Sequence, residues 1–235
     1  MLKDIFNIPS PGKPEATPPA DIIKPGEFAA ILARAGVGKT ALLVQIAING
    51  ILRGKNVLHI STGDPVDKVD LWYREVFQRL DQEDESLQIR KRKDELLRRR
   101  FIMTFETETF SIEKLKKRVN ELISQNIFLP AQILIDDFSF DTVSTEALSD
   151  LKGFVADNKL SFWFTIRTHR DEPVGDRRIP TRLLPLTEWF DLMIRLEPDN
   201  ERIYVRQVGV GGEDDDQAGA LYLDPSTLLI KMTAS

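Results

Sequence analysis

No cysteine occurs in the 235-residue sequence, which excludes disulfide bonds, thiolate metal sites and cysteine nucleophiles. There are only two histidines, His59 and His169, and they are too few and too far apart to predict a metal site. His59 lies in an apolar segment, where we expect a buried, hydrogen-bonded strand residue. No apolar run approaches the roughly 20 residues of a membrane-spanning helix, and the N-terminal stretch lacks the apolar part of a secretory signal. We therefore expect a cytoplasmic protein without membrane contact.

An excess of positive charge is also missing, because 32 lysines and arginines face 37 aspartates and glutamates. The net charge of −5 gives the chain no overall attraction to nucleic acid, so any such contact would need a local patch. The basic run RKRKDELLRRR, residues 90–100, has acidic residues beside and inside it, and its cations would wrap around a helix. This pattern favours a solvated helix face or a subunit contact.

The composition, 42% hydrophobic and 29% charged, is typical of a globular protein. Five prolines between residues 9 and 20 predict an extended N-terminal arm over residues 1–23. Residues 24–235 are numerous enough for one large core, so we expect a single domain there. Within this domain the stretch GGEDDDQAG, residues 211–219, predicts an acidic loop.

Short apolar runs alternate with amphipathic segments up to about residue 170. Beyond that point we predict two hairpins, one turning at Pro198-Asp199-Asn200 and one closing the chain. The order predicts an α/β fold: a mostly parallel sheet with helices on both faces and antiparallel hairpins at the C-terminus. The predicted strands are 28–33, 56–62, 100–105, 131–138 and 160–170; the predicted helices are 39–53, 66–80, 112–123 after a Ser111 cap, and 145–157, with 81–100 extending or following the second helix.

The first predicted strand leads into ARAGVGKT, which fits the phosphate-binding pattern G-x-x-x-x-G-K-[S/T] except at its first position. Glycines at 36 and 38 allow a tight turn whose backbone can approach phosphate groups. The lysine side chain would then contact the β and γ phosphates, and the threonine hydroxyl would bind Mg²⁺. The predicted nucleotide-binding residues are Ala33, Arg34, Ala35, Gly36, Val37, Gly38, Lys39 and Thr40.

A second motif, ILIDDF, brings a pair of carboxylates to the end of the strand predicted at 131–138. Ligands of open α/β folds bind at the carboxyl edge of the sheet, where such a side chain can support Mg²⁺. Asp136 follows the apolar run directly and is the better candidate for the metal, together with Thr40. Asp137 is expected to cap the next turn.

With both motifs in place, the chain resembles the RecA-like P-loop ATPases, in the branch of KaiC, RadA and DnaB-type helicases. KPGEFAAILARAGVGKTALLVQIA, residues 24–47, looks like the start of a DnaB-type motor domain, a branch that tolerates alanine at the first motif position. FDLMIRLEPDNERIYVRQVG, residues 190–209, looks like the closing strands of KaiC-like domains. The resemblance implies a RecA-like sheet from residue 24 to about 209, with ATP and Mg²⁺ as ligands. It also implies a homo-oligomer that can close into a ring.

The chain departs from this family at two places that matter for hydrolysis. Where relatives carry the glutamate that orients the attacking water, this sequence has Gly63-Asp64, so Asp64 is the nearest substitute. Where KaiC-like proteins carry a K-x-R pair that reaches the neighbouring subunit's phosphate, Arg206 keeps one cation and Val208 replaces the other. A cation of this kind is worth about 10³ to 10⁵ in rate. The resemblance therefore implies nucleotide binding more strongly than fast hydrolysis.

The segment TIRTHR at the end of the strand predicted at 160–170 has two interpretations. In the family a polar residue here senses the γ-phosphate, a role open to Arg167 or Thr168, whereas a solvated strand end is equally compatible with the pattern. The basic loop that follows, residues 167–178, is the best indication of nucleic-acid contact in the sequence, because the corresponding loops of DNA-handling relatives face the ring channel.

Three functions follow from these patterns. The first is an oligomeric ATP-binding protein with slow or regulated hydrolysis. The second is a nucleotide-gated regulatory module that binds a protein partner without useful turnover, which ATP-dependent assembly with a dead hydrolysis site would support. The third is a single-strand nucleic-acid motor or recombinase-like factor, which salt-dependent binding to single strands would reveal; the absence of a separate N-terminal domain counts against it.

Overall fold

The computed structural model describes residues 21–83, 89–140, 143–169, 172–173, 175, 178–199, 201–209 and 220–233. All but the last three residues of the predicted arm, and the whole predicted acidic loop 211–219, lie outside these ranges. The predicted basic loop 167–178 is described only in part.

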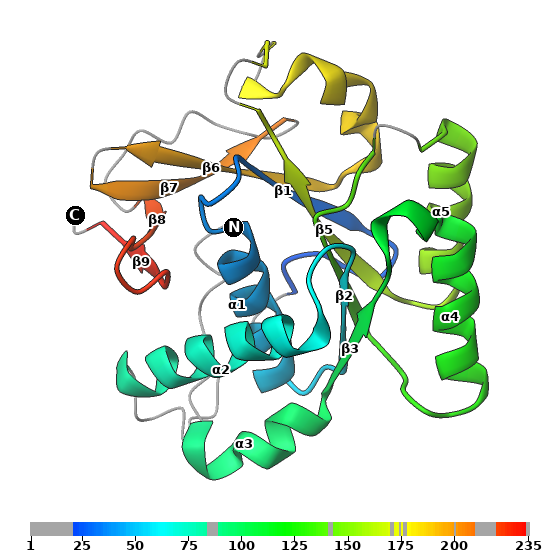
Figure 1. Cartoon of the computed structure of the whole chain (residues 1–235). Coiled ribbons are helices and arrows are strands. Elements are labelled where there is room, and N and C mark those ends of the chain that lie inside the picture. The colour runs from blue at the N-terminus through cyan, green and yellow to red at the C-terminus, as the bar shows by residue number, and fades with distance from the viewer. Residues whose placement is uncertain are drawn as a thin grey trace.

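Within these ranges nine strands form one sheet in the order β3-β2-β4-β5-β1-β6-β7-β8-β9 (Figure 1). The first six of this order pair in parallel, and the last three add antiparallel hairpins. The α/β class, the mostly parallel sheet and the C-terminal hairpins are thus confirmed. The strands are β1 Phe28–Ala33, β2 Val57–Ser61, β3 Arg100–Thr104, β4 Gln132–Asp136, β5 Ser161–Arg167, β6 Leu192–Asp199, β7 Arg202–Val208, β8 Leu221–Leu223 and β9 Ile230–Met232.

Helices cover both faces of the sheet, as the alternation of strands and helices predicted (Figure 1). Successive side chains of a strand point to opposite faces, and β1 is buried on both, so it reads as a continuous apolar run. Ala29 and Ile31 join the core under α1 and α2, whereas Phe28 and Ala30 join the core under α4 and α5. The helices are α1 Lys39–Leu52, α2 Val66–Glu83, α3 Ile89–Arg98, α4 Ile112–Ser124 and α5 Thr145–Asp157, with short 3₁₀ turns at Thr107–Thr109 and Thr181–Trp189.

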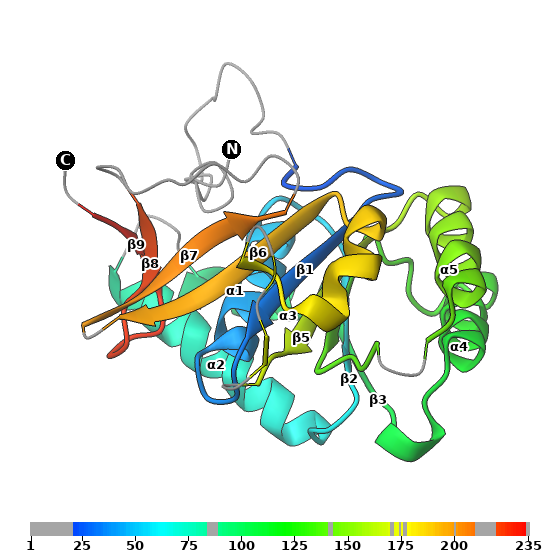
Figure 2. The same cartoon turned by 90° about the horizontal axis from the view of Figure 1, so that it is seen from above.

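The strand order opens a crevice at the carboxyl end of β1, because the chain goes to one side of β1 for β2 to β5 and to the other side for β6 (Figure 2).

Capping side chains set the residues at which α4 and α5 begin. Ser111 accepts a hydrogen bond from the Lys114 amide at the start of α4, which confirms the predicted cap. Ser144 plays the same part for α5.

The structure corrects several predicted boundaries. The strand predicted at 131–138 ends at Asp136, because Asp137 has a φ of 59° that an extended strand cannot contain. The basic run does not lie wholly on a helix, since Arg100 begins β3 and forms a 2.5 Å ion pair with Asp70. The 3₁₀ turn at Thr181–Trp189 was not predicted, because it contains a proline and lacks a clear helical period. Among the described helices, none is long and apolar enough to cross a membrane.

Candidate functional site

The loop between β1 and α1 has the backbone that its glycines predicted. Gly36 and Gly38 have φ values of 76° and 102°, in the left-handed region that favours glycine. Gly38 precedes α1 without a side-chain cap, and the first turn of α1 carries no acidic residue. The first N–H groups of a helix have no partner within the helix, so this terminus suits an anion.

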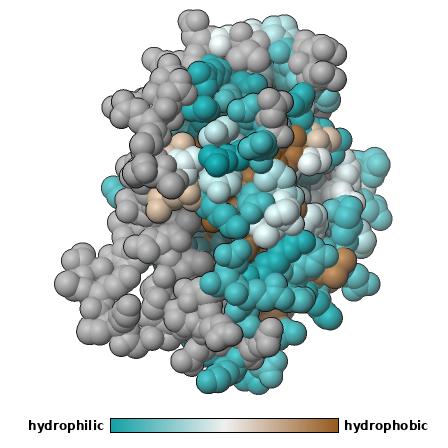
Figure 3. All heavy atoms as spheres, turned by 90° about the vertical axis from the view of Figure 1, so that its left-hand side faces the viewer, coloured by the Kyte–Doolittle hydropathy of each residue, from teal (hydrophilic) through white to brown (hydrophobic). Residues whose placement is uncertain are grey.

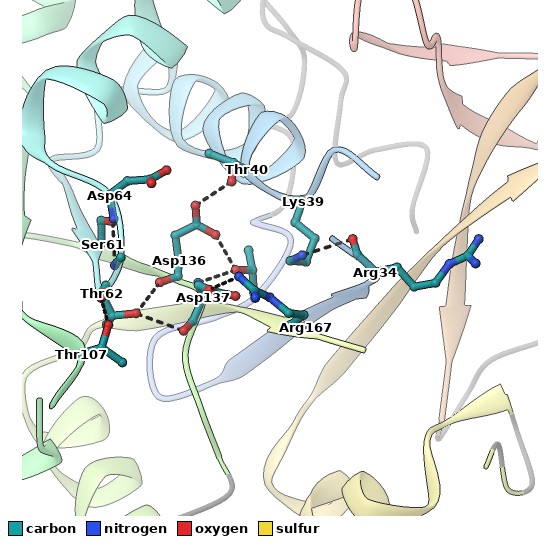
Figure 4. A network of polar contacts seen from close by, with 12 residues as sticks. Arg34, Lys39, Thr40, Ser61, Thr62, Asp64, Thr107, Asp136, Asp137 and Arg167 are labelled. Atoms are coloured by element: carbon teal, nitrogen blue, oxygen red, sulfur yellow. Dashed lines mark hydrogen bonds and ion pairs between the residues drawn. The ribbon is translucent and has the colours of Figure 1, made fainter. Parts of the chain in front are cut away.

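Thr40 and Asp136 meet across 96 residues of sequence, as Figure 4 shows. The Thr40 hydroxyl donates to Oδ2 of Asp136 at 2.7 Å. The other carboxylate oxygen, Oδ1, accepts a hydrogen bond from the Thr165 hydroxyl on β5. Asp136 is only 6% exposed, so both of its oxygens are held in a buried position at the end of β4. The two motifs singled out in the sequence therefore form one site.

Lys39 lies inside the same site and is 9% exposed. Its Nζ donates to the carbonyl oxygen of Arg34 at 3.3 Å. Burial lowers the pKa of Lys39, because an ammonium group loses hydration there; Asp137 and Asp136 oppose this shift and Arg167 adds to it. An ammonium group under these conditions would gain from a further negative charge in the cavity.

Asp137 turns away from Asp136 and pairs with Arg167 at 2.7 Å (Figure 4). Its left-handed backbone is held on both sides, since its N–H donates to the Thr165 hydroxyl at 2.7 Å and its carbonyl accepts from Thr62 at 3.0 Å. Asp137 therefore makes the turn that the sequence predicted and also keeps Arg167 beside the cavity.

Asp64 follows β2 and also lines the cavity. Its backbone N–H donates to the Ser61 hydroxyl at 2.8 Å, and its carboxylate pairs with Lys68 on α2, also at 2.8 Å. A Cβ added to Gly63 would meet nothing within 4 Å, so no side chain fills the position expected for a water-orienting glutamate. The carboxylate of the adjacent Asp64 is thus already paired with a cation.

These groups line one cavity of about 330 Å³ at the carboxyl edge of the sheet, which also includes the side chain of Trp72. Arg206 is not among its lining residues: it lies on β7 and pairs with Glu197 at 3.1 Å. Its role toward a neighbouring subunit stays a prediction. Thr168 donates its N–H to the Ala33 carbonyl and does not line the cavity, so Arg167 is the better placed of the two candidates. The predicted residues that line the cavity are Ala35, Gly36, Gly38, Lys39, Thr40, Asp64, Asp136, Asp137 and Arg167.

Sequence reasoning missed several contributors, among them Thr165, Lys68, Trp72 and Leu228. Lys68 carried a signal, because a lysine four residues after an aspartate on a helix pairs with it. Thr165 carried only a faint one, as the polar residue within the apolar run LSFWFTIR. Leu228 carried none, since it comes from the far C-terminal turn.

His59 is the buried, hydrogen-bonded strand residue that the sequence predicted. Its Nδ1 lies 3.0 Å from the Tyr73 hydroxyl, beneath α2. Burial lowers the pKa of His59 to about 4, so the ring is neutral at pH 7. We assign it to the core and not to the site.

A scan of the sequence against protein-family models finds no match, and a search among curated proteins finds no similar relative. The site is therefore judged on its own geometry. The described residues contain no cluster of three or more His, Asp or Glu side chains that could hold a metal ion alone. A hydroxyl and a carboxylate, as Thr40 and Asp136 supply, are oxygen ligands of the kind that Mg²⁺ uses when phosphate oxygens complete its shell.

Proposed function

We propose that this chain is a RecA/KaiC-like P-loop protein that binds ATP with Mg²⁺ and hydrolyses it slowly or under regulation. The glycine loop and the start of α1 would bind the phosphates, with Lys39 as their cation. Thr40 and Asp136 would hold Mg²⁺, which neutralises phosphate charge when bound.

The observation that carries the proposal is the 2.7 Å contact between Thr40 and Asp136, with the buried Lys39 in the same cavity. Burial of a charged group costs free energy, and the two nearby aspartates offset this cost for Lys39 only in part, since its pKa stays lowered. A bound phosphate would offset the remainder.

One observation favours the second function, a nucleotide-gated module without useful turnover. The carboxylate of Asp64 is paired with Lys68 at 2.8 Å, so it must leave this ion pair before it can orient a water molecule. On this proposal the cavity holds groups for phosphate and Mg²⁺, whereas its candidate for activating water is already engaged. We expect turnover well below that of a typical ATPase.

The proposal is tested by measuring Mg²⁺-ATP affinity and turnover in one preparation of the wild-type chain and of Lys39→Ala. We expect binding by the wild type and a loss of at least about 100-fold in the variant, because a charge-assisted phosphate contact disappears. The matched control is Lys116→Ala, which removes a lysine from the opposite face, where it pairs with Asp150 at 2.5 Å.

Turnover that Lys39→Ala abolishes would assign ATPase activity, and binding without turnover would assign the nucleotide-gated module. No binding by the wild type would overturn both. Equal losses in Lys39→Ala and Lys116→Ala would point to general destabilisation and would count against the proposal.

The homo-oligomer, the protein partner and the cytoplasmic location stay predictions. Where described residues are visible in Figure 3, on the side of the molecule that lies at the left of Figure 1, they are mostly hydrophilic. In the described part of the basic run, two cations are already paired: Arg92 with Glu95, and Arg100 with Asp70. These pairs do not favour the nucleic-acid motor.

A further inference from the structure

The last hairpin of the chain reaches the phosphate-binding loop. Leu228, in the turn between β8 and β9, lines the cavity together with Gly38 and Lys39. A Cβ added to Gly38 would lie 3.3 Å from Leu223 and 3.8 Å from Leu228. The cavity is therefore bounded on one side by residues that come almost 200 positions later in the sequence, and Figures 1 and 2 both place this hairpin beside α1 and α2.

Gln45 connects this turn to α1 through both ends of its amide. Its Nε2 donates to the Leu228 carbonyl at 2.7 Å, and its Oε1 accepts from the Ile230 N–H at 2.9 Å. Nε2 also donates to the Ala41 carbonyl, one turn earlier in α1. Gln45 is 6% exposed, so these bonds form away from competing water.

Leu228 needs such support, because its φ is 54°, a left-handed conformation that a leucine adopts at a cost. The turn adds two more constraints. The Leu228 N–H donates to the Asp224 carbonyl at 2.6 Å, and Arg79 of α2 donates to the Thr227 carbonyl at 2.6 Å. A strained backbone persists only where surrounding contacts over-determine it, so losing the Gln45 contacts should let Leu228 leave the cavity.

We infer that Gln45 is a positioning residue: it holds Leu228 as the C-terminal wall of the cavity and so sets the affinity for the nucleotide. The inference rests on the proposed function. Gln45 itself need not touch the ligand, because it acts through Leu228. Gln45 thereby fixes the Leu228 wall relative to the first turn of α1, which would bind phosphate.

The test compares wild type, Gln45→Leu and Leu228→Gly in Mg²⁺-ATP binding, with amide hydrogen exchange at Ile230 measured on the free protein. Gln45→Leu should speed that exchange and weaken affinity about tenfold, since both hydrogen bonds between this side chain and the turn are lost. Leu228→Gly should weaken affinity similarly while keeping the fold, because glycine accepts the left-handed backbone and only the wall is removed.

Gln45→Glu separates positioning from packing. A protonated carboxyl can donate to the Leu228 carbonyl and accept from Ile230, whereas an ionised carboxylate cannot donate. The affinity of this variant relative to wild type should therefore recover as the pH is lowered. The matched control is Gln132→Leu, which removes a buried amide near Gly50 at the far end of α1 and should leave affinity unchanged.

The inference would be overturned if Gln45→Leu exchanged the Ile230 amide faster but bound Mg²⁺-ATP as tightly as wild type. It would also be overturned if Gln45→Leu left the exchange of that amide unchanged. An equal loss in Gln132→Leu would also overturn it. A wild-type chain that binds no Mg²⁺-ATP would overturn the proposed function itself, and this result is seen before any Gln45 variant is compared.

Discussion

The two ends of the cavity are built differently. At the buried end, Lys39, Asp136 and Thr165 are nearly inaccessible to water, Thr40 is half-buried, and both oxygens of the Asp136 carboxylate accept hydrogen bonds. At the exposed end, Lys68 is 57% and Arg167 is 53% exposed, and each forms an ion pair with a neighbouring aspartate. Exposed pairs of this kind contribute about 0.2–1 kcal/mol and break easily. The buried end is thus preorganised for a ligand, while the exposed end is free to rearrange.

From this contrast we expect the buried end to set affinity and the exposed end to set turnover. Preorganised groups favour tight binding, because they cost no reordering when the ligand arrives. Groups that must first leave an ion pair favour control, because something else has to release them. Changes at the buried end should therefore act on affinity, and changes at the exposed end should act on turnover.

The largest expected effect comes from Asp136→Asn at the buried end. The amide lacks the negative charge with which the carboxylate attracts Mg²⁺, so affinity for ATP in the presence of Mg²⁺ should fall at least about 100-fold. Binding measured with excess chelator should change little between variant and wild type. A loss that is equal with and without Mg²⁺ would contradict the metal role of Asp136.

A smaller loss is expected from Thr165→Val, which removes the hydroxyl that bonds to Asp136 and keeps the side-chain shape. Mg²⁺-dependent affinity should fall about tenfold, as is common when a residue that orients a metal ligand is lost. Thr165→Ser keeps the hydroxyl and should bind nearly as wild type. If both variants lose affinity equally, Thr165 serves packing and not the orientation of Asp136.

At the exposed end, Lys68→Met should raise turnover about threefold without changing affinity, since it frees the Asp64 carboxylate to orient water. Steady-state phosphate release at saturating ATP measures this effect. Adding Asp64→Asn to the variant should remove the gain. If Lys68→Met instead lowers turnover, the lysine assists the reaction. That result would contradict the assignment of the exposed ion pairs to the control of turnover.

The smallest effect should be that of Lys39→Met on the ligand-free protein. Burial lowers the pKa of Lys39, so the folded state holds this ammonium less favourably than the unfolded chain does. That penalty is full below the lowered pKa of the folded state, fades as the pH rises from there toward the unfolded value of 10.5, and is absent above it. Removing the charge should leave the free energy of unfolding unchanged or raise it by about 1 kcal/mol. Urea denaturation of wild type and variant at pH 7 measures this difference. A clearly lower free energy of unfolding in Lys39→Met would mean that Lys39 stabilises the fold.

Much of the fold could be predicted because its signals are local. The β1 strand, the α5 helix and the Ser111 cap are encoded by a few adjacent residues whose burial and propensity agree. The predicted strand boundaries were wrong where the backbone conformation of a single residue ends the element. Asp137 is an example, because its φ of 59° ends β4 at Asp136. Sequence periodicity does not report φ, so the last residue of β4 could not be placed in advance.

The chain's sequence by itself determined the glycine loop with Lys39 and Thr40, and the acidic end of β4, because each motif is contiguous and its chemistry follows from the residues in order. Only the tertiary structure decided that Thr40 contacts Asp136 and that Thr165 orients it, since the pairing of β4 with β5 aligns Ile135 with Phe164 and so brings the next residues together. It also brought Leu228 to the loop through Gln45, across 183 residues. Contacts of that separation depend on strand register and on packing, which no short segment specifies.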